Sequence, residues 1–351
     1  LRDRKLTRTS LISIRSNGNH PAGGESQAGI SADGRFVTFQ SVAKLAPNDT
    51  NPLSDVYIRD RKLGKTKLIS VRSNGAAATN GDSSDPTISA NGRYVAFTSS
   101  STDLVNGDGN GSDDVFLRDR RSRTTIRVSV PTGGGDADGQ SHRPDVSDLG
   151  GVAFSSEADD LVGSDTNGME DAFVHTPAGK TKRVSVASNG DEADNGGSRP
   201  SISRTGNKIA FQSESTNLSS LAGGQSDVYV HTMADGKTRL ASRASNGTHP
   251  PGSAEIFHGA LSFSGRFIAF TSDQALVTAD ANSTWDMYWH DMKTGRTRLA
   301  SYSQDGSSAA GSDEGTISGD GRWVGFDSTA TNLVPDDGNG TSDGFLRGPM
   351  I

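Results

Sequence analysis

The chain has 351 residues, with 43 glycines, no cysteine and a formal net charge of −7. The lack of cysteine excludes disulfides and thiolate chemistry, and the negative charge argues against nucleic acid or an anionic membrane as the main partner. No apolar run approaches the ~18 residues that a membrane-spanning helix needs. The sequence therefore predicts no membrane insertion.

A short unit recurs six times along the chain. Its clearest copy, residues 89–97, reads Ser-Ala-Asn-Gly-Arg-Tyr-Val-Ala-Phe. Asn-Gly favours a two-residue hairpin turn, and the aromatic and β-branched residues that follow favour a strand. The turn glycines lie 56 to 59 residues apart, which indicates a repeat architecture. They are Gly34, Gly92, Gly150, Gly206, Gly265 and Gly321.

Each repeat is expected to hold four short strands. In the second repeat these are 86–89, 93–99, 114–119 and 125–130. Short, regularly spaced strands with turn signals between them are typical of propeller blades. We therefore predict an all-β fold, a single six-bladed β-propeller over residues 1–351 with four-stranded blades. The expected blades are approximately 25–71, 83–130, 141–186, 197–243, 256–302, and 312–348 together with 5–15.

The two ends of the chain complement each other. The last repeat stops at Ile351 before a fourth strand, whereas residues 9–14 match the fourth strand of the other repeats. We therefore expect the N-terminal strand to be the outer strand of the last blade, closing the ring and removing an exposed edge. Because the chain starts at Leu1, within a motif and without a signal segment, we expect it to be the mature portion of a longer precursor.

Two motifs of the repeat carry a family resemblance. Asp-Gly-Arg followed by Val-Ala-Phe, and then Asp-Val-Tyr-x-x-Asp, resembles the TolB-type, WD40-like propeller repeat of bacteria. The resemblance covers essentially the whole chain. It implies a β-propeller with an extracellular or periplasmic location in a bacterium. It implies no single activity, because this scaffold hosts binding proteins, lyases and peptidase accessory domains.

An acidic motif, Asp-x-Asn-x-x-x-Asp, recurs between the second and third strands of five repeats. Hard cations such as Ca²⁺ bind such side-chain oxygens, so we expect structural calcium in at least one loop. The alternative is that these residues form Asx turns that cap the third strand. The fourth repeat has Leu221 in place of the first Asp and keeps Asp227. The expected metal ligands are Asp49, Asn51, Asp55, Asp108, Asn110, Asp114, Asp165, Asn167, Asp171, Asp280, Asn282, Asp286, Asp337, Asn339 and Asp343.

A second candidate site is one position near the start of each first strand. It is polar and differs in every repeat, whereas the scaffold around it recurs. We expect these residues to bind an anionic or polyhydroxylated ligand; the alternative is a solvated ring of compensating charges. The residues are Gln27, Asp85, Arg143, Arg199, His258 and Glu314, with His142 and Asp313 beside them.

Catalytic motifs are absent: the sequence has no His-Glu-x-x-His, Gly-x-Ser-x-Gly or phosphate loop. We predict a non-catalytic binding or interaction module with a carbohydrate or protein ligand at the top face. It would be a monomer or part of a larger surface protein, and a purely structural domain is a further reading. The alternative is a polysaccharide lyase or glycosidase, with His258 or His142 as base and Arg143 and Arg199 neutralising a uronate.

Three further histidines share one position in the third strands. His175, His231 and His290 stand where other repeats have Arg. We expect them to be strand residues that face the protein surface and not metal ligands.

Overall fold

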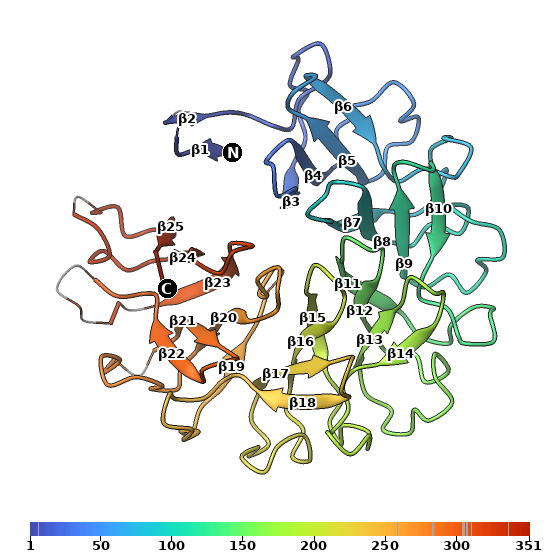
Figure 1. Cartoon of the computed structure of the whole chain (residues 1–351). Coiled ribbons are helices and arrows are strands. Elements are labelled where there is room, and N and C mark those ends of the chain that lie inside the picture. Colours follow the sequence, from blue (N-terminus) through green and yellow to red (C-terminus); the bar gives the residue numbers. More distant parts are fainter. Residues whose placement is uncertain are drawn as a thin grey trace. The chain divides into compact units, whose positions relative to one another are not determined.

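The structure is a computed structural model that describes residues 1–5, 7–257, 259–282, 284–303, 306, 308–309, 311–335 and 337–351, without the side chains of Glu25 and Asp313. Every regular element in these ranges is a β-strand (Figure 1), which confirms the all-β prediction. None of the described residues belongs to a helix that could cross a membrane.

Five antiparallel sheets have four strands each, in sequence order from one edge to the other. The first two are β3 (Glu25–Ile30), β4 (Phe36–Ser41), β5 (Asp55–Asp60), β6 (Lys65–Leu68), and β7 (Ser83–Ile88), β8 (Tyr94–Ser99), β9 (Asp114–Asp119), β10 (Thr124–Arg127). The third and fourth are β11 (Ser141–Val146), β12 (Val152–Ser156), β13 (Asp171–His175), β14 (Thr181–Arg183), and β15 (Ser198–Ile202), β16 (Lys208–Ser213), β17 (Asp227–Thr232), β18 (Lys237–Leu240). The fifth is β19 (Ala254–Glu255), β20 (Phe267–Ser272), β21 (Asp286–Asp291), β22 (Arg296–Leu299).

These five sheets, together with the sheet of the last repeat described below, are the blades of a six-bladed β-propeller, as predicted. The third strand of each blade begins at the last Asp of the acidic motif, so the fold fixes one carboxylate of every loop at a strand terminus.

The chain forms two compact units, which are described separately below. They are Leu1–Val152 with Ala158–Val162 and His175–Thr181, and Ala153–Glu157 with Gly163–Val174 and Lys182–Ile351.

The core of each blade contains a stacked aromatic pair from its second and third strands. Phe97 lies opposite Phe116 in the β8–β9 register, with ring centroids 5.7 Å apart. The same contact explains why an aromatic residue recurs at both positions of the repeat. The other pairs are Phe39–Tyr57, Phe154–Phe173, Phe211–Tyr229, Phe270–Tyr288 and Phe326–Phe345.

The turn between β7 and β8 is longer than the predicted two-residue hairpin. Gly92 has a φ of 69° and Ser89 N–H donates to the Tyr94 carbonyl at 3.0 Å. Ser89 Oγ donates to Asn91 Oδ1 at 2.8 Å, and this amide oxygen accepts Arg93 N–H at 2.9 Å. These side-chain bonds hold the wider turn, which the Asn-Gly pair alone did not reveal.

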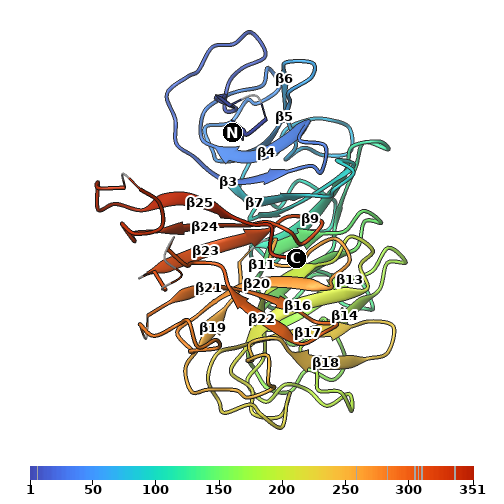
Figure 2. The same cartoon turned by 60° about the vertical axis from the view of Figure 1, so that its left-hand side comes forward.

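The last blade differs from the prediction. Among the described residues its sheet has three strands, β23 (Ser312–Ile317), β24 (Val324–Ser328) and β25 (Asp343–Arg347), which lie one above another in Figure 2. The N-terminal segment instead forms a separate two-stranded sheet of β1 (Arg2–Asp3) and β2 (Arg8–Thr9).

A local hairpin explains this difference. Leu1 and Ser10 exchange two backbone hydrogen bonds, of 2.8 and 2.9 Å, at the base of the hairpin. Further along, the Ile14 carbonyl accepts a hydrogen bond from Thr66 Oγ1 of the first blade. The backbone groups of the expected 9–14 strand are thus partly satisfied within the first unit.

Candidate functional site

The last Asp of each acidic motif has a structural role in the first five blades. Its Oδ1 accepts a hydrogen bond from a Ser of the segment that follows the fourth strand, and that Ser Oγ accepts the N–H of the residue after the Asp. In the first blade Ser70 Oγ lies 2.5 Å from Asp55 Oδ1 and 3.1 Å from Val56 N. The other Asp–Ser pairs are Asp114–Ser129, Asp171–Ser185, Asp227–Ser242 and Asp286–Ser301.

The motif Asn makes the Asx turn of the alternative interpretation. Asn51 Oδ1 accepts Leu53 N–H at 2.8 Å, and its Nδ2 donates to the Ala78 carbonyl at 3.0 Å in the loop between blades. The Asn side chain therefore already has a structural role in the turn, as the Asx-turn alternative predicts. The equivalent donations to the inter-blade loop are Asn110–Ala137, Asn167–Ala193 and Asn282–Ala309.

In the second blade a buried guanidinium pairs with both motif carboxylates. Arg127, at the end of β10, has Nη1 3.1 Å from Asp108 and 3.1 Å from Asp114, and Nη2 2.6 Å from Asp136. The Arg127 side chain is 6% exposed. A charge this deeply buried persists only when paired, so acid and base require one another here.

The third blade repeats this arrangement. Arg183 lies 3.0 Å from Asp165 and 3.6 Å from Asp171, and it also pairs with Glu192. Asp165, Asp171 and Glu192 offer ligand atoms within 4.8 Å of one another, so this acidic triad could hold a metal. Arg183 already supplies a positive charge to all three, however, and this weakens the case for an ion.

In the first blade no cation among the described residues pairs with the acids. Leu68 stands where Arg127 stands in the second blade, and Tyr57 replaces Phe116 and donates its hydroxyl to Asp49 Oδ2. Asp49 Oδ1 and Asp55 Oδ2 are buried without a hydrogen-bond partner in the described structure. Burial, with the nearby Asp49 charge, raises the pKa of Asp55 to about 6 despite the opposing Ser70 hydrogen bond.

The fifth blade has the same features. Leu299 replaces the Arg, and the Tyr288 hydroxyl donates to Asp280 Oδ2. Asp286 is fully buried, and its Oδ2 has no hydrogen-bond partner among the described residues. Burial and the Asp280 charge raise the pKa of Asp286 to about 7, against the effect of Ser301.

The fourth blade has lost its first Asp and uses a histidine instead. His249 Nε2 lies 2.7 Å from Asp227 Oδ1, and Gln274 Nε2 lies 3.4 Å from the same oxygen. Hydrogen bonding to Asp227 raises the pKa of His249.

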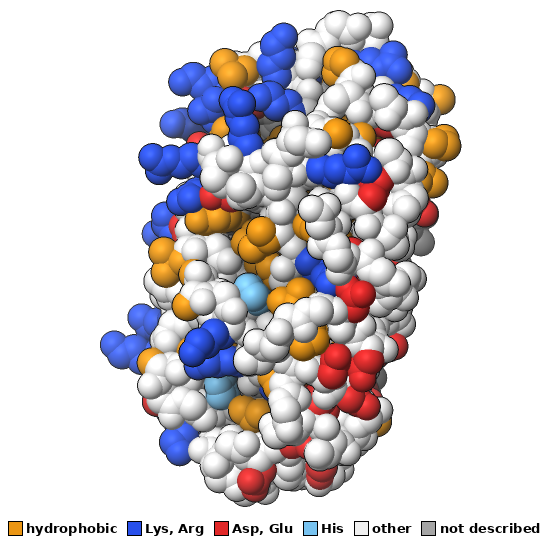
Figure 3. Space-filling view, turned by 90° about the vertical axis from the view of Figure 1, so that its right-hand side faces the viewer, with side chains coloured by type: hydrophobic (Ala, Val, Ile, Leu, Met, Phe, Trp, Pro, Cys, Tyr) orange, Lys and Arg blue, Asp and Glu red, His pale blue; other side chains and the backbone are white. Residues whose placement is uncertain are grey.

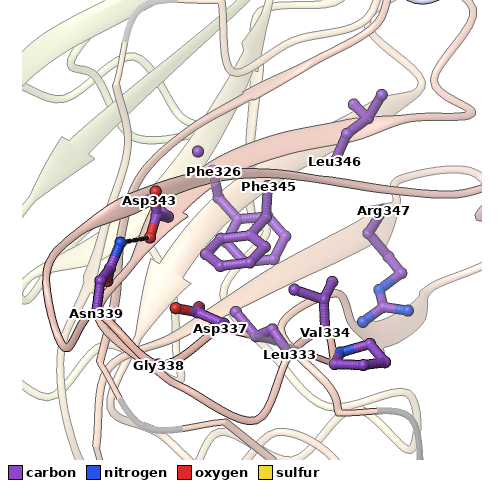
Figure 4. Close-up of a pocket in the computed structure, with 12 residues that line it drawn as sticks. Phe326, Leu333, Val334, Asp337, Gly338, Asn339, Asp343, Phe345, Leu346 and Arg347 are labelled. Carbon is purple, nitrogen blue, oxygen red and sulfur yellow. Dashed lines mark hydrogen bonds between the residues drawn. The ribbon is translucent and has the colours of Figure 1, made fainter.

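The sixth blade opens its acidic loop to a surface pocket of about 900 Å³. Figure 4 shows the stacked Phe326 and Phe345 in this pocket beside Asp337. Asn339 Nδ2 donates to Asp343 Oδ2 at 2.8 Å. Because this loop is exposed, its acids need no buried counter-charge.

The second candidate site has an unusual backbone. Non-glycine residues rarely adopt positive φ, and each such residue costs roughly 1–3 kcal/mol. Four of the predicted ligand-binding residues do so, with φ of 47° at Gln27, 51° at Asp85, 52° at Arg143 and 51° at Arg199. The strand register shifts at this point in β3, β7 and β15, so the residues there are bulged out of the ladder.

The side chains of Gln27 and Arg199 make polar contacts among the described residues. In the first unit Gln27 Oε1 accepts Asp85 N–H at 3.2 Å. In the second unit Arg199 pairs with Glu255 at 3.2 Å and lies over the Phe257 ring at 5.3 Å. The sequence analysis missed Glu255 and Phe257, although both lie on the equivalent segment of the next repeat.

The remaining candidate positions include Glu314, His142 and His258. Glu314 is exposed. Burial raises the pKa of Asp113 above its ordinary value, and the nearby His142 partly opposes this shift. His258 lies outside the described residues, so its predicted convergence with Arg143 and Arg199 stays a prediction.

Comparison with known proteins rests on structure alone. No family model matches the sequence, and no curated protein matches it. The propeller domain of the Trilobed protease from Pyrococcus furiosus, described as having an open velcro topology, has a TM-score of 0.54 at 12% identity, covering 92% of this chain and 82% of its own. An oligogalacturonate lyase in complex with manganese has a TM-score of 0.53 at 12% identity, covering 90% and 75%. TolB from Acinetobacter baumannii has a TM-score of 0.44 at 15% identity. The match covers 79% of this chain and 54% of TolB, so this chain spans about half the length of that protein.

The fold is a β-propeller, like the Trilobed protease domain and the oligogalacturonate lyase. At identities this low the likenesses show the fold alone. The activities of the proteases and lyases among these structures are therefore not carried over to this propeller.

The third-strand histidines of the propeller are buried, contrary to the prediction that they face the surface. His175, His231 and His290 are 7%, 6% and 0% exposed. The Nδ1 of each pairs with a fourth-strand Thr: Thr181, Thr238 and Thr297 at 3.2, 2.9 and 2.8 Å. The third strand is covered on both faces, so its alternation does not mark an exposed side.

Charge separates along the strands of the propeller. β5 begins at an acidic loop and ends at a turn that carries Arg61 and Lys62, and β9 ends at a turn with Arg121 and Arg123. In Figure 3, Lys and Arg side chains gather along the left-hand edge and Asp and Glu side chains toward the lower right. The net negative charge of the chain thus conceals basic turns at one end of these blades.

Proposed function

We propose that this propeller is a non-catalytic binding module whose ligand contacts the bulged residue Arg199 at the start of the first strand of its blade. The observation that carries the proposal is the positive φ shared by Gln27, Asp85, Arg143 and Arg199. Backbone strain of this kind clusters where a side chain must be presented to a ligand. Packing alone does not require four different polar side chains at one strained position.

The ligand we propose is a carbohydrate with acidic groups. Arg199 combines a guanidinium, which pairs with carboxylates, with the Phe257 ring, a surface on which a sugar can stack. A protein ligand is less well supported, since large aromatic anchors are scarce at these positions. The fold likeness to an oligogalacturonate lyase makes oligogalacturonate the first ligand to test.

We further propose that calcium stabilises the acidic loops, and that the protein acts in the extracellular space or the periplasm. Support comes from the buried carboxylates of the motif that have no cation among the described residues. Calcium is abundant outside cells, where modules with affinities of about 10⁻⁴–10⁻³ M are occupied.

Titration calorimetry with oligogalacturonate, and with a neutral oligosaccharide of equal length, tests the binding function. Arg199→Gly should weaken binding of the acidic oligomer at least ~10-fold and also raise the melting temperature, because glycine removes the strain at φ 51°. Arg204→Ala, just beyond the other end of β15, is the matched control and should bind as wild type. No binding of either oligomer, or wild-type affinity in Arg199→Gly, would overturn the proposal.

The same experiment covers the enzymatic alternative. A lyase would convert oligogalacturonate into unsaturated products that absorb ultraviolet light, with His142 or His258 as base. Unchanged absorbance over long incubation at saturating ligand supports a binding module, whereas steady product formation replaces it with the lyase.

A further inference from the structure

We infer that the first and fifth blades each hold a calcium ion between their two motif aspartates, and that Arg127 and Arg183 replace this ion in the second and third blades. The inference rests on the calcium role proposed above and assigns it to two sites, Asp49 with Asp55 and Asp280 with Asp286. The acidic motif is the same in all four blades, so the residues that surround it decide which loops bind an ion.

Two sequence positions change together. Blades with Arg at the fourth-strand position that lies opposite the aromatic residue of the third strand have Phe as that residue, as in Phe116 with Arg127 and Phe173 with Arg183. Blades with Leu there have Tyr, as in Tyr57 with Leu68 and Tyr288 with Leu299. Each acid pair thus has either a guanidinium or a tyrosine hydroxyl.

The guanidinium and the tyrosine hydroxyl differ in charge. Arg127 Nη1 lies 3.1 Å from both Asp108 and Asp114, which marks the point between the two acids where a positive charge fits. In the first blade the two equivalent acids interact only with neutral donors among the described residues, from Tyr57, Ser70 and Asn51. Neutral hydroxyls cannot compensate two buried carboxylates, since desolvation disfavours each charge and the two repel.

Buried carboxylate oxygens without a hydrogen bond occur in the third blade too, but there Asp165 Oδ1 lies 3.0 Å from Arg183 Nη1, whereas those of the first and fifth blades have no ion-pair partner among the described residues. Asp49 and Asp55 are 6% and 1% exposed, and Asp286 is fully buried. Asp49 Oδ1, Asp55 Oδ2 and Asp286 Oδ2 have no hydrogen-bond partner among the described residues, while the other oxygen of each is held by Tyr or Ser. The hydroxyls thereby fix each carboxylate with one oxygen free, which is how second-shell donors orient metal ligands.

Calcium suits these sites best. Carboxylate oxygens are hard ligands, and Ca²⁺ tolerates irregular geometry with backbone carbonyls and water completing its 6–8 oxygens. The fourth blade supports this logic, because the loss of its first Asp is accompanied by His249 on the remaining Asp227. There a single histidine can balance a single carboxylate.

Equilibrium dialysis with calcium, and magnesium as control, tests the assignment by stoichiometry. Wild type should bind two ions per chain, and Asp49→Asn and Asp280→Asn one each. Asp108→Asn, the matched control in the second blade, should leave the number unchanged. The exchange Tyr57→Phe/Leu68→Arg should also remove one ion, while Phe116→Tyr/Arg127→Leu should create a third site.

Each result has a distinct meaning. No bound calcium in wild type would overturn both this inference and the proposed calcium role, and would leave a shared proton on each acid pair. Bound calcium that survives Asp49→Asn and Asp280→Asn but is lost in Glu192→Gln would move the ion to the third blade and overturn the inference alone. Oligogalacturonate binding by the double variant Asp49→Asn/Asp280→Asn separates these outcomes from the carbohydrate function.

Discussion

The second and first blades solve one electrostatic problem in different ways. Both carry two buried carboxylates at the entrance to the third strand, tied to the same Ser and Asn network. The second blade places Arg127 between its acids, whereas the first has Leu68 and a Tyr57 hydroxyl. Backbone geometry is therefore shared by the repeats, while charge balance is settled separately in each blade.

The comparison shows why identical motifs need not bind identical ligands. A loop motif supplies ligand oxygens, but the residue facing it from the fourth strand decides whether those oxygens are available. An Arg at that position supplies its own counter-charge, and a Leu leaves the charge uncompensated. A motif count alone would therefore overestimate the number of cation sites.

The largest expected effect follows from removing the guanidinium. Arg127→Leu leaves Asp108 and Asp114 buried and unpaired, so we expect the free energy of unfolding to fall by about 3–5 kcal/mol in the presence of chelator. Urea titration measures this loss. Arg239→Leu, which removes an exposed pair with Asp235, is the control and should have little effect.

Adding Phe116→Tyr to Arg127→Leu should recover part of this stability, and more of it with calcium than without. If the effects of the two substitutions on the free energy of unfolding simply add, with and without calcium, then the Tyr–Leu and Phe–Arg combinations are not alternative ways to balance the charge of the acid pair.

Removing the hydroxyls of two equivalent serines should lower the free energy of unfolding by different amounts. Ser70→Ala removes a donor to Asp55 in a blade without Arg, whereas Ser129→Ala does so where Arg127 still pairs with Asp114. We expect losses of about 2–3 kcal/mol and about 1–2 kcal/mol, respectively, measured without calcium. Equal losses would mean that the guanidinium does not support Asp114.

The sequence predicted the strands well because local signals determine them. The third strand of the second blade, Asp114–Asp119, matches the expected bounds, since an Asp marks its start and a turn marks its end. The last blade was harder to predict, since the choice of partner for residues 9–14 depends on competition between a local hairpin and a distant strand edge.

The candidate site was only partly visible in the sequence. The motif aspartates were found, but Arg127, Arg183, Glu192 and the two tyrosines were not, because their roles depend on contacts between segments far apart in the chain. One signal was available: the alternation of Arg and Leu at a fixed fourth-strand position. The left-handed backbone of Arg199 had no such signal, since nothing in its residue type favours positive φ.

The smallest expected effect concerns the fourth blade, where pH should act through His249. Asp227 and Gln274 face this imidazole, and the carboxylate raises its folded-state pKa above the unfolded value of about 6.5. A raised pKa means that the folded state binds the proton more tightly, so the stabilisation is fully present below about pH 6.5 and is lost as pH rises through the folded pKa. We expect a decline of about 1–2 kcal/mol across this window, measured by urea unfolding at successive pH values. His249→Gln keeps a donor to Asp227 without the charge, so its stability should not show this decline. A decline of equal size in His249→Gln would assign the pH dependence to another group and leave His249 as a neutral hydrogen-bond donor.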